Sequence, residues 1–377
     1  MSRTSSPRGG PPTGGRATQS AFDSPRKRAH DGAIARSRTS TRRLPSGCLK
    51  SLLCLLLAGW LGAWAFAQWA FNVNSNLVAW AVRDSREGLL VRVRGNAWKS
   101  PAQVTPAELA AALVERHREP GFSWRSLRVR RPAGALGRLS QGLFGAEVHV
   151  ITLSPDQFEF MASHRPGFAG TTAAERLGAE KLWFAVTANF RDPDGRPLGW
   201  VWHEGRQVNR AFPEWSGCFF VKGGRPYFGP KSLLDEVPGP IEEGAQVYPS
   251  VMKNHTIFPY VSLKPDAFFD GSKISYRSLG GMRRDGTIVF ILSGSGGVMN
   301  VTEAAELALK LDVQHATLLD GGRALQYSLR TEDGPWHFAA FNTRLETGSK
   351  TLERQLSPVY IGARRRAPEI IAVPPEP

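Results

Sequence analysis

The sequence predicts an α+β fold, with a large mixed or antiparallel sheet and few packed helices, preceded by one transmembrane helix. Three observations support this prediction. Short apolar strands separated by Gly, Pro and Asp turns dominate the chain from about residue 146. Two segments carry a complete helix-starting signal, and one long apolar run lies near the amino terminus. With 41% hydrophobic and 21% charged residues, the chain can bury a core, which excludes disorder throughout.

Residues 1–50 are predicted to form a disordered, basic, cytoplasmic tail. They contain 11 of the 48 Lys and Arg residues but 2 of the 33 Asp and Glu residues, a net charge of +9. They are rich in Ser, Thr, Pro and Gly and have no hydrophobic period, so they cannot bury a core. Because aromatic residues are not regularly interleaved with the basic ones, Phe22 being the single Phe, Trp or Tyr, and no folded nucleic-acid motif accompanies them, we expect no nucleic-acid partner.

Residues 51–73 are predicted to form the transmembrane helix. The segment has no charged residue, is dominated by Leu, Trp and Phe, and reaches the roughly 20 residues that a helix needs to cross a bilayer. Positive charge precedes it and almost none directly follows it, which places the amino terminus in the cytoplasm and the main domain in the periplasm. We therefore expect a single-pass signal anchor in the inner membrane. Residues 65–67 (AFA) have the form of a signal-peptidase site, so cleavage after Ala67 is the alternative.

Residues 77–145 are predicted to form a small leading α/β subregion. Thr105, Pro106 and Glu108 are a helix cap, a first-turn proline and a capping-box acid. The helix that they begin is expected to run to about Arg118 and to stop at Pro120-Gly121. Alternating apolar residues predict one strand before this helix, at 89–94, and another after it, at 127–130. The Gly/Arg-rich stretch 134–145 is expected to link this subregion to the main domain.

Residues 146–362 are predicted to form the main domain, and residues 363–377 a disordered Pro-rich tail. Asn300 and Glu303 form a second capping box, which predicts a helix with its apolar residues on one face. The strands expected in this domain are 147–151, 181–186, 199–203, 217–222, 226–228, 287–292 and 315–319.

Three loops of the main domain could carry chemistry. In residues 318–323 (LLDGGR), Asp320 stands at the end of an apolar strand, and the two glycines after it let the backbone turn close to a ligand. Residues 187–199 form a polar loop between two apolar strands, with Asp194 at its tip. Residues 294–297 (GSGG) lead into the second capped helix, where backbone N–H groups can hold an anion. Taken singly, each loop can equally be a plain turn.

Other catalytic and metal signatures are missing from the sequence. It contains neither a His-Glu-x-x-His nor a Gly-x-Ser-x-Gly motif, and its histidines lack metal-ligand spacing. We therefore predict no cofactor and assign no metal ligands, and we leave open whether a metal assists the chemistry.

The order of the segments resembles the phosphodiester glycosidase family over roughly residues 145–330. A strand leads into a loop that closes with Asp-Gly-x-Pro-x-Gly, and a Gly-x-Phe-Phe hairpin and a Gln-containing strand follow. An Arg-x-x-x-Gly segment with an Asp-Gly turn, a helix and a final Leu-Asp-Gly-Gly complete the pattern. The matching stretches are 187–199, 217–221, 245–252, 277–281 with 285–286, and 303–322. The chain departs from the family pattern at Thr187, where the family loop begins with Asn, and at Arg323, where a serine is missing after the glycines.

The resemblance implies hydrolysis of a sugar-1-phosphodiester, so the expected partner is a phosphorylated glycan or a sugar-phosphodiester substrate. Such a reaction needs a carboxylate beside the anomeric carbon and guanidinium groups on the departing phosphate. The resemblance implies Asp320 as the principal carboxylate, with Asp194 or Glu303 as the second. It also implies phosphate binding by Arg277 and Arg323, orientation of sugar hydroxyls by Asn189 and Gln246, and close backbone approach at Gly280, Gly321 and Gly322.

Two other functions compete with this hypothesis. In the first, the domain has lost catalysis and binds a glycan or a lipid headgroup. The departures from the family pattern at Thr187 and Arg323 would then explain the loss of catalysis. Alternatively, the protein is a structural partner in envelope assembly, with tryptophans as its contact surface. The glycosidase hypothesis requires that the segments near residues 190, 246, 277 and 320 meet around one pocket.

Overall fold

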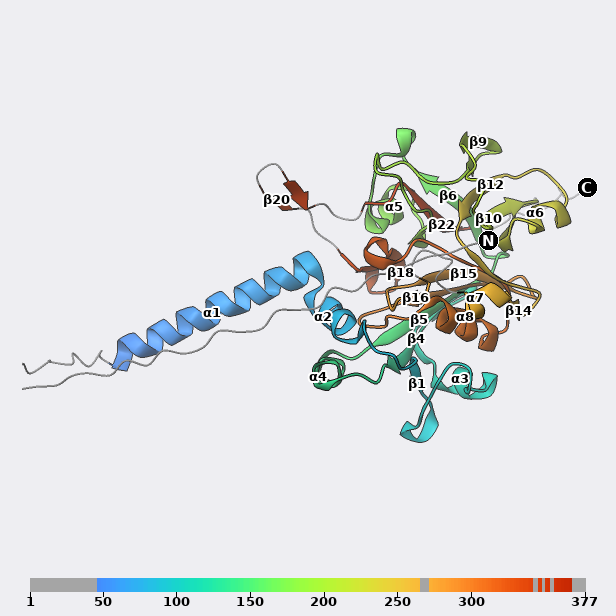
Figure 1. Cartoon of the computed structure of the whole chain (residues 1–377). Coiled ribbons are helices and arrows are strands. Elements are labelled where there is room, and N and C mark those ends of the chain that lie inside the picture. The colour runs from blue at the N-terminus through green and yellow to red at the C-terminus, as the bar shows by residue number, and fades with distance from the viewer. Residues whose placement is uncertain (1–45, 265–270, 342–344, 348–349, 353–355, 368–377) are drawn as a thin grey trace, which may run out of the picture. The chain divides into compact units, whose positions relative to one another are not determined.

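The fold is built on antiparallel sheets, of which the largest has ten strands (Figure 1). The computed structural model describes residues 46–264, 271–341, 345–347, 350–352 and 356–367. In the large sheet β3 (Val114–Glu119) pairs with β4, and the other strands follow in a single order. That order is β14 (Thr256–Ile257), β13 (Ser250–Lys253), β17 (Val313–Leu318), β15 (Ser278–Arg283), β16 (Ile288–Ser293), β5 (Glu147–Leu153), β4 (Phe122–Arg130), β1 (Leu90–Arg92) and β2 (Trp98–Lys99).

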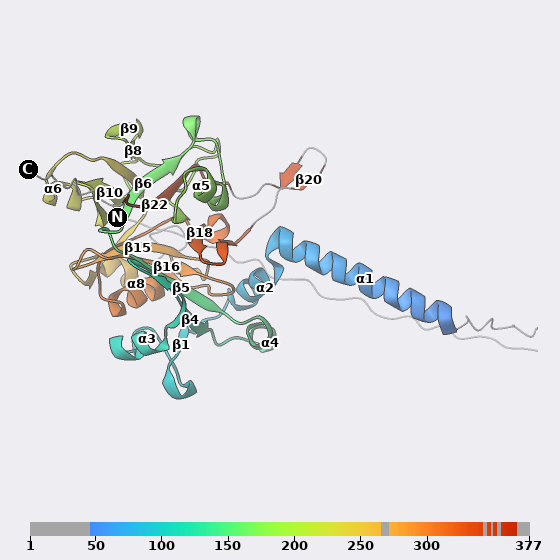
Figure 2. The same cartoon turned by 180° about the vertical axis from the view of Figure 1, so that it is seen from behind.

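Two five-stranded sheets and a short two-stranded ribbon complete the β structure (Figure 2). The first five-stranded sheet has the order β11 (Arg225–Pro230), β10 (Gly217–Lys222), β12 (Glu243–Val247), β8 (Val201–His203) and β9 (Arg206–Asn209). The second has the order β19 (Gly334–Ala339), β18 (Gln326–Thr331), β7 (Phe184–Thr187), β22 (Val359–Arg365) and β6 (Phe158–His164). The ribbon pairs β20 (Leu345–Thr347) with β21 (Lys350–Leu352).

The helices are short except for the first, so the prediction of an α+β fold with few packed helices is confirmed. The capping box of Asn300 and Glu303 is formed as predicted, and it begins α8. The helices after α1 are α2 (Val73–Val82), α3 (Pro106–Ala112), α4 (Ala135–Phe144), α5 (Ala173–Ala179), α6 (Leu233–Glu236), α7 (Pro259–Leu263) and α8 (Val301–Lys310).

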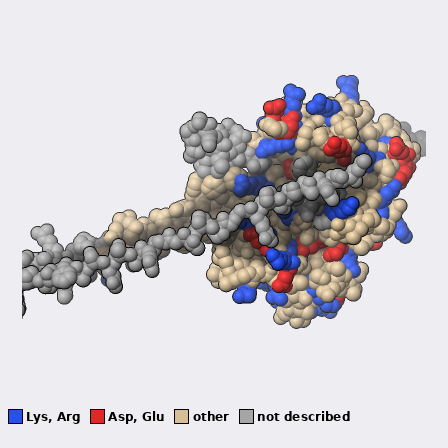
Figure 3. All heavy atoms as spheres, viewed as in Figure 1, with Lys and Arg blue, Asp and Glu red and all other residues tan. Residues whose placement is uncertain are grey.

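The apolar helix near the amino terminus is α1 (Ser46–Phe71). Within it, Leu49–Phe71 is long and apolar enough to cross a membrane, with a mean hydropathy of 1.7, although a signal sequence meets the same criteria. Figure 3 shows that the visible surface of this helix is almost wholly uncharged. The helix ends at Phe71 rather than at residue 73, because Asn72 adopts a left-handed conformation and α2 begins after it. Residues 1–45 of the predicted tail lie outside the described residues, and 46–50 are helical.

The core lies on both faces of the large sheet. Along β16, the side chain of Phe290 packs against the five-stranded sheets, where its ring centroid lies 4.7 Å from that of Phe184 and 5.4 Å from that of Phe228. Its neighbours Val289 and Ile291 belong to the cluster on the other face, which α3, α7 and α8 cover. Every residue of β16 is buried, which explains why this strand is continuously apolar in the sequence.

Three local predictions were wrong at their boundaries. The helix that begins at Pro106 ends at Ala112, and residues 114–119 form β3 instead, paired antiparallel with β4 through a turn at Gly121. The predicted link over 134–145 is the helix α4. Residues 363–365, expected to belong to the disordered tail, form the end of β22 instead, and residues 368–377 lie outside the described residues. In each case pairing or packing with distant residues outweighs local propensity.

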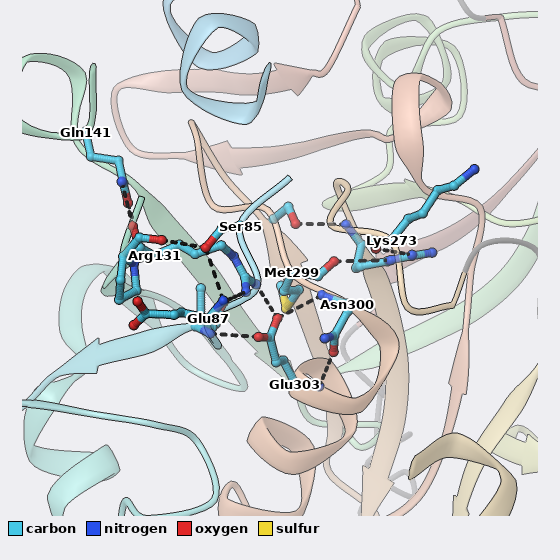
Figure 4. Close-up of polar contacts among 12 residues, drawn as sticks. Ser85, Glu87, Arg131, Gln141, Lys273, Met299, Asn300 and Glu303 are labelled. Atoms are coloured by element: carbon cyan, nitrogen blue, oxygen red, sulfur yellow. Dashed lines mark hydrogen bonds and ion pairs between the residues drawn. The ribbon is translucent and has the colours of Figure 1, made fainter. Parts of the chain in front are cut away.

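The leading strands are fastened to α8 by a buried ion pair (Figure 4). The side chains of Glu303 and Arg131 form this pair, with exposed fractions of 7% and 3%. Glu303 also accepts hydrogen bonds from the backbone N–H of Leu89 at 2.7 Å and of Asn300 at 2.9 Å. Arg131 donates in turn to the carbonyl of Glu87 at 2.6 Å. One carboxylate therefore caps α8 and fixes the chain just before β1.

Replacing Glu303 by Ala should lower the free energy of unfolding by about 3–5 kcal/mol, because the Arg131 guanidinium would stay buried without a carboxylate. Urea unfolding of the full chain in detergent, followed by tryptophan fluorescence, measures this change. Removing the exposed partner of Arg83 with Asp84→Ala is the control, and it should cost no more than about 1 kcal/mol. The double variant Glu303→Leu with Arg131→Met should recover part of the loss, and equal stability of Glu303→Ala and the wild type would contradict the assignment.

Candidate active site

Loops from distant parts of the sequence enclose a cavity of about 300 Å³ at the end of β17. The cavity combines apolar walls with two cationic side chains and two aromatic rings. The segments near residues 190, 248, 277 and 320 all contribute to it, so the structure brings together the parts of the chain that the glycosidase hypothesis requires to meet. The lining residues are Phe190, Tyr248, Pro249, Lys273, Ile274, Ser275, Arg277, Val301, Leu318, Leu319, Gly321 and Gly322.

The turn that follows β17 places Asp320 directly behind the cavity wall. Its backbone N–H donates to the carbonyl of Ala188 at 3.0 Å, and Gly322 donates to the carbonyl of Tyr276 at 2.8 Å. A Cβ atom on Gly321 would lie 2.7 Å from that same Tyr276 oxygen, and Gly322 has a φ of +59°. Both positions therefore require glycine, the first for space and the second for its backbone conformation.

The carboxyl group of Asp320 is almost fully buried, with an exposed fraction of 6% for the residue. Burial raises its pKa from the ordinary 3.8 to about 7, because an ionised carboxylate loses hydration there. The charge of Arg191 and a hydrogen bond from the Gly321 N–H oppose this rise. A carboxyl group that titrates near neutral pH beside a cavity is characteristic of a catalytic acid or base.

Two cations line the cavity, Lys273 and Arg277. The guanidinium of Arg277 donates to the carbonyl of Lys273 at 2.7 Å and to that of Met299 at 3.3 Å, and Figure 4 labels both acceptor residues. Its backbone N–H is held by the Ser293 hydroxyl at 2.8 Å. The guanidinium is thus positioned by the chain, whereas the Lys273 side chain is exposed to solvent.

An aromatic wall faces these cations. Phe190 and Tyr248 line the cavity, and both rest on the buried ring of Trp215. The centroid of the Trp215 ring lies 5.4 Å from that of Phe190, edge to face, and 5.7 Å from that of Tyr248, stacked. Trp215 therefore fixes the positions of two rings that a sugar could contact.

Gln246 and Asn189 were expected to orient sugar hydroxyls, but the structure places Gln246 behind the aromatic wall. Its side-chain oxygen accepts from the N–H groups of Trp200 and Phe212, and its amide nitrogen donates to the carbonyls of Phe212 and Trp215. These four hydrogen bonds use the full capacity of the amide, so Gln246 holds the segment that carries Trp215.

The amide nitrogen of Asn189 donates to the carbonyls of Gln246 at 2.6 Å and Leu198 at 3.1 Å. Its side-chain oxygen is buried and has no hydrogen-bond partner among the described residues. A buried acceptor of this kind is usually satisfied by water or a ligand. Asn189 precedes Phe190 of the cavity wall, but it is fully buried and does not itself line the cavity.

Four further expected residues lie away from the cavity lining. Glu303 is engaged in the ion pair with Arg131, and Asp194 lies in an exposed turn. Arg323 is also exposed, with its guanidinium 5.9 Å from the centroid of the Phe341 ring. Gly280 serves core packing rather than ligand approach, because a Cβ atom there would lie 2.6 Å from the Phe228 ring.

Sequence reasoning missed the residues that complete the cavity. Lys273 stands four positions before Arg277, outside any motif, and Phe190 and Tyr248 read as ordinary apolar residues. The one available signal was the pair of basic residues at 273 and 277. Within the described ranges, no group of three or more His, Cys, Asp or Glu side chains could hold a metal ion.

Residues 180–359 match the family model described as phosphodiester glycosidase. These residues form a phosphodiester glycosidase family domain. Every residue that lines the cavity falls within this range. The domain thus contains the cavity, the Asp320 turn and both cations.

A search of solved structures finds a similar fold at a TM-score of 0.50 and weaker matches below it. The catalytic domain of zebrafish N-acetylglucosamine-1-phosphodiester alpha-N-acetylglucosaminidase, auto-inhibited by its pro-peptide, matches with a TM-score of 0.50 at 14% identity and covers 68% of this chain and 87% of its own. A hypothetical protein from Synechocystis scores 0.41 at 14% identity, covering 67% and 64% of the two chains. A putative exported protein from Burkholderia pseudomallei scores 0.37 at 11% identity, covering 74% and 91%. A comparison with curated protein sequences finds no significant match.

Replacing Asp320 by Asn should stabilise the phosphodiester glycosidase domain above pH 7. Because the folded-state pKa is raised from 3.8 to about 7, the stability that comes from the protonated carboxyl is complete below pH 3.8 and is lost as pH rises to about 7. At pH 8 the variant should therefore gain up to about 4 kcal/mol in free energy of unfolding, at about 1.4 kcal/mol per pKa unit. At pH 4 the two proteins should unfold at similar urea concentrations.

Asp194→Asn is the matched control, since that carboxyl group is exposed and its replacement should leave the pH dependence unchanged. Urea unfolding at pH 4 to 8 measures both variants. A constant difference between Asp320→Asn and wild type across this range would show that Asp320 does not titrate near neutrality.

Proposed function

We propose that this protein hydrolyses the glycosidic bond of a sugar-1-phosphodiester, releasing the sugar from a phosphorylated partner. The observation that carries the proposal is the buried Asp320, with its raised pKa, directly behind a cavity that holds two cations. The membership of residues 180–359 in the phosphodiester glycosidase family supports the same reaction.

The phosphate is the group that Arg277 and Lys273 would bind. A guanidinium can contact two phosphate oxygens at once, and an ammonium adds a second positive charge. Both side chains come from the segment that enters β15, so one short stretch of chain would fix the anion. This assignment replaces the pair Arg277 and Arg323 by Arg277 and Lys273.

The sugar would pack against Phe190 and Tyr248. Aromatic rings offer a flat apolar face to a sugar ring, and Trp215 holds both in place. The unpartnered oxygen of Asn189, which is buried next to Phe190, would accept a hydrogen bond from a water molecule between it and the sugar. Buried polar acceptors give such a site selectivity, because a ligand that lacks the matching hydroxyl leaves them unsatisfied.

In the chemical step, the bond between the anomeric carbon and the phosphate oxygen breaks and water adds to that carbon. The electron pair leaves with the phosphate, which departs as a monoester bound by the two cations. Because Asp320 lies behind the cavity wall, its ionised carboxylate would take the proton from the attacking water through one intervening water molecule, and its charge would favour the positive charge that develops on the sugar. A phosphate is a good leaving group, so the departing oxygen needs little help from an acid.

Asp320→Asn should lower kcat by about 10²–10⁴-fold while the variant stays folded. The assay uses the purified full chain in detergent and a sugar-1-phosphodiester in H₂¹⁸O, with the released sugar and phosphomonoester identified by mass spectrometry. The heavy oxygen should appear in the sugar. Wild-type kcat should also rise with pH through an apparent pKa near 7, because the ionised form of Asp320 is the active one. Heavy oxygen in the phosphate would refute glycosidic cleavage.

Lys273→Met should raise KM by about tenfold or more, because it removes one charge from the phosphate site. Arg323→Met is the matched control, since Arg323 is an exposed cation that lies outside the cavity lining, and it should change KM less than twofold. Equal effects of the two substitutions would mean that the phosphate lies elsewhere.

A binding module without catalysis is the second candidate. It is favoured by one observation: among the described residues that line the cavity, none is Asp or Glu. If wild type and Asp320→Asn bind the phosphodiester with equal affinity in calorimetry and neither turns it over, this second function replaces the first.

We also propose that Leu49–Phe71 anchors the protein in the inner membrane, with the amino terminus cytoplasmic and the domain periplasmic. The length and hydropathy of α1 and the basic residues before it support this topology. In spheroplasts, external protease should digest the domain while a tag at the amino terminus stays protected. Amino-terminal sequencing of the mature protein checks retention, because cleavage after Ala67 would yield a chain that begins at Gln68.

A further inference from the structure

The helix α4 buries its small residues and exposes its large apolar ones. Gly137 and Ser140 are buried, and a Cβ atom on Gly137 would lie 3.1 Å from the carbonyl oxygen of Ala81 in α2. α2 and α4 lie side by side in both views (Figures 1 and 2). The exposed side is apolar, with exposed fractions of 46% for Leu136, 59% for Leu139 and 67% for Leu143. These three leucines are spaced i, i+3, i+7 and so form one stripe.

A stripe of exposed leucines is costly in water unless something covers it. The neighbouring helix α2 also exposes apolar side chains, because Leu77 and Trp80 are 36% and 53% exposed. Trp80 and the leucines are the residue types that amphipathic helices place at a lipid interface.

Positive charge is concentrated in the same part of the chain. Residues 83–145 contain 12 Lys and Arg and 5 Asp and Glu residues, a net charge of +7. Residues 146–377 contain 25 and 26, a net charge of −1. The folded part of the protein therefore owes its positive charge to the region that holds α4 and β1–β4.

Exposed arginines border α4 directly. A groove of about 710 Å³ beside it is lined by Arg86, Arg128, Arg130 and Arg138, with one carboxylate, Glu87. Arg130 stacks on Trp98, 4.2 Å from the ring centroid. The guanidinium groups of Arg86, Arg128 and Arg138 are exposed, and none forms an ion pair with a described residue. The leucine stripe lies on a different side of α4 from the groove, which none of the three leucines lines. Unpaired guanidinium groups on one side of a helix and apolar side chains on another match the phosphates and acyl chains of a lipid surface.

We propose that α4 and the arginine groove beside it dock on an anionic lipid bilayer, with the leucines at the boundary of headgroups and acyl chains and the arginines on lipid phosphates. Chain connectivity favours this occupant over a protein, because Asn72 alone separates the apolar helix α1 from α2, on which α4 packs. The proposal is independent of the proposed hydrolysis, since α4 and the groove contribute no residue to the lining of the active-site cavity.

The test places a fluorophore on α4 and reads its contact with lipid. The full chain, with Cys48 and Cys54 replaced by Ser, carries Leu139→Cys labelled with an environment-sensitive dye, while Cys218 is buried. The protein is reconstituted into phosphatidylcholine vesicles with or without 30% phosphatidylglycerol. In anionic vesicles the dye should be strongly quenched by spin-labelled lipid and shielded from iodide. The same dye at Val208→Cys, an exposed position of β9, should show the reverse.

Charge reversal provides the second arm. Each arginine near an anionic surface strengthens binding roughly fivefold, so Arg128→Glu with Arg138→Glu should lower lipid quenching at position 139 to the level in neutral vesicles. Arg206→Glu with Arg210→Glu, two exposed arginines elsewhere, is the matched control and should change nothing. Circular dichroism checks that both variants are folded.

Two outcomes would overturn the proposal. Equal iodide access to position 139 in anionic and neutral vesicles would show that α4 stays in water. Shielding of position 139 in detergent that grows with protein concentration would show that a second copy of the chain, rather than lipid, covers the stripe.

Discussion

The position of the Asp320 carboxyl group is set by the meeting of two sheets rather than by one loop. The turn that carries it continues β17 of the large sheet, and its backbone bonds reach Tyr276 beside β15 and Ala188 after β7. A change in the packing of either sheet would therefore move the carboxyl relative to the cavity. This constraint explains why Gly321 and Gly322 are needed, because the turn must pass within contact distance of the Tyr276 carbonyl. A site built on sheet ends in this way is held more rigidly than one on free loops.

Burying a carboxyl group costs stability at neutral pH, and the rest of the fold must offset that cost. The core on both faces of the large sheet supplies the burial, and the charge of Arg191 reduces the penalty. Residues behind the cavity wall also support the site. Gln246 does not line the cavity, but it donates a hydrogen bond to the backbone carbonyl of Trp215. Trp215 in turn packs against Phe190 and Tyr248, the two rings of the wall. The geometry of the site therefore depends on residues one layer removed from any ligand.

The sequence predicts elements whose signals are local and misses those that depend on distant partners. The capping box at Asn300 and the hairpin turn at Gly223-Gly224 hold because caps and turns are decided by neighbouring residues. The helix at Pro106 was predicted too long because strand pairing of residues 114–119 with β4 is invisible in a local pattern. The same limit applies to the site. Asp320 is prominent at the end of an apolar strand, whereas Lys273 and Tyr248 become site residues through the arrangement of the chain alone.

The net charge of +15 also becomes interpretable once it is divided along the chain. Residues 1–50 carry +9, residues 83–145 carry +7, and the remainder of the chain is close to neutral. Positive charge within about 15–20 residues of a span sets its orientation, but charge within a folded domain has little effect on translocation. Most of the basic residues of 83–145 lie beyond that distance and on β1–β4 and α4. If Leu49–Phe71 spans a membrane as proposed, its insertion would account for the first concentration of charge and not for the second, whereas the proposed anionic surface would account for the arginines of the groove and for the exposed leucines of α4.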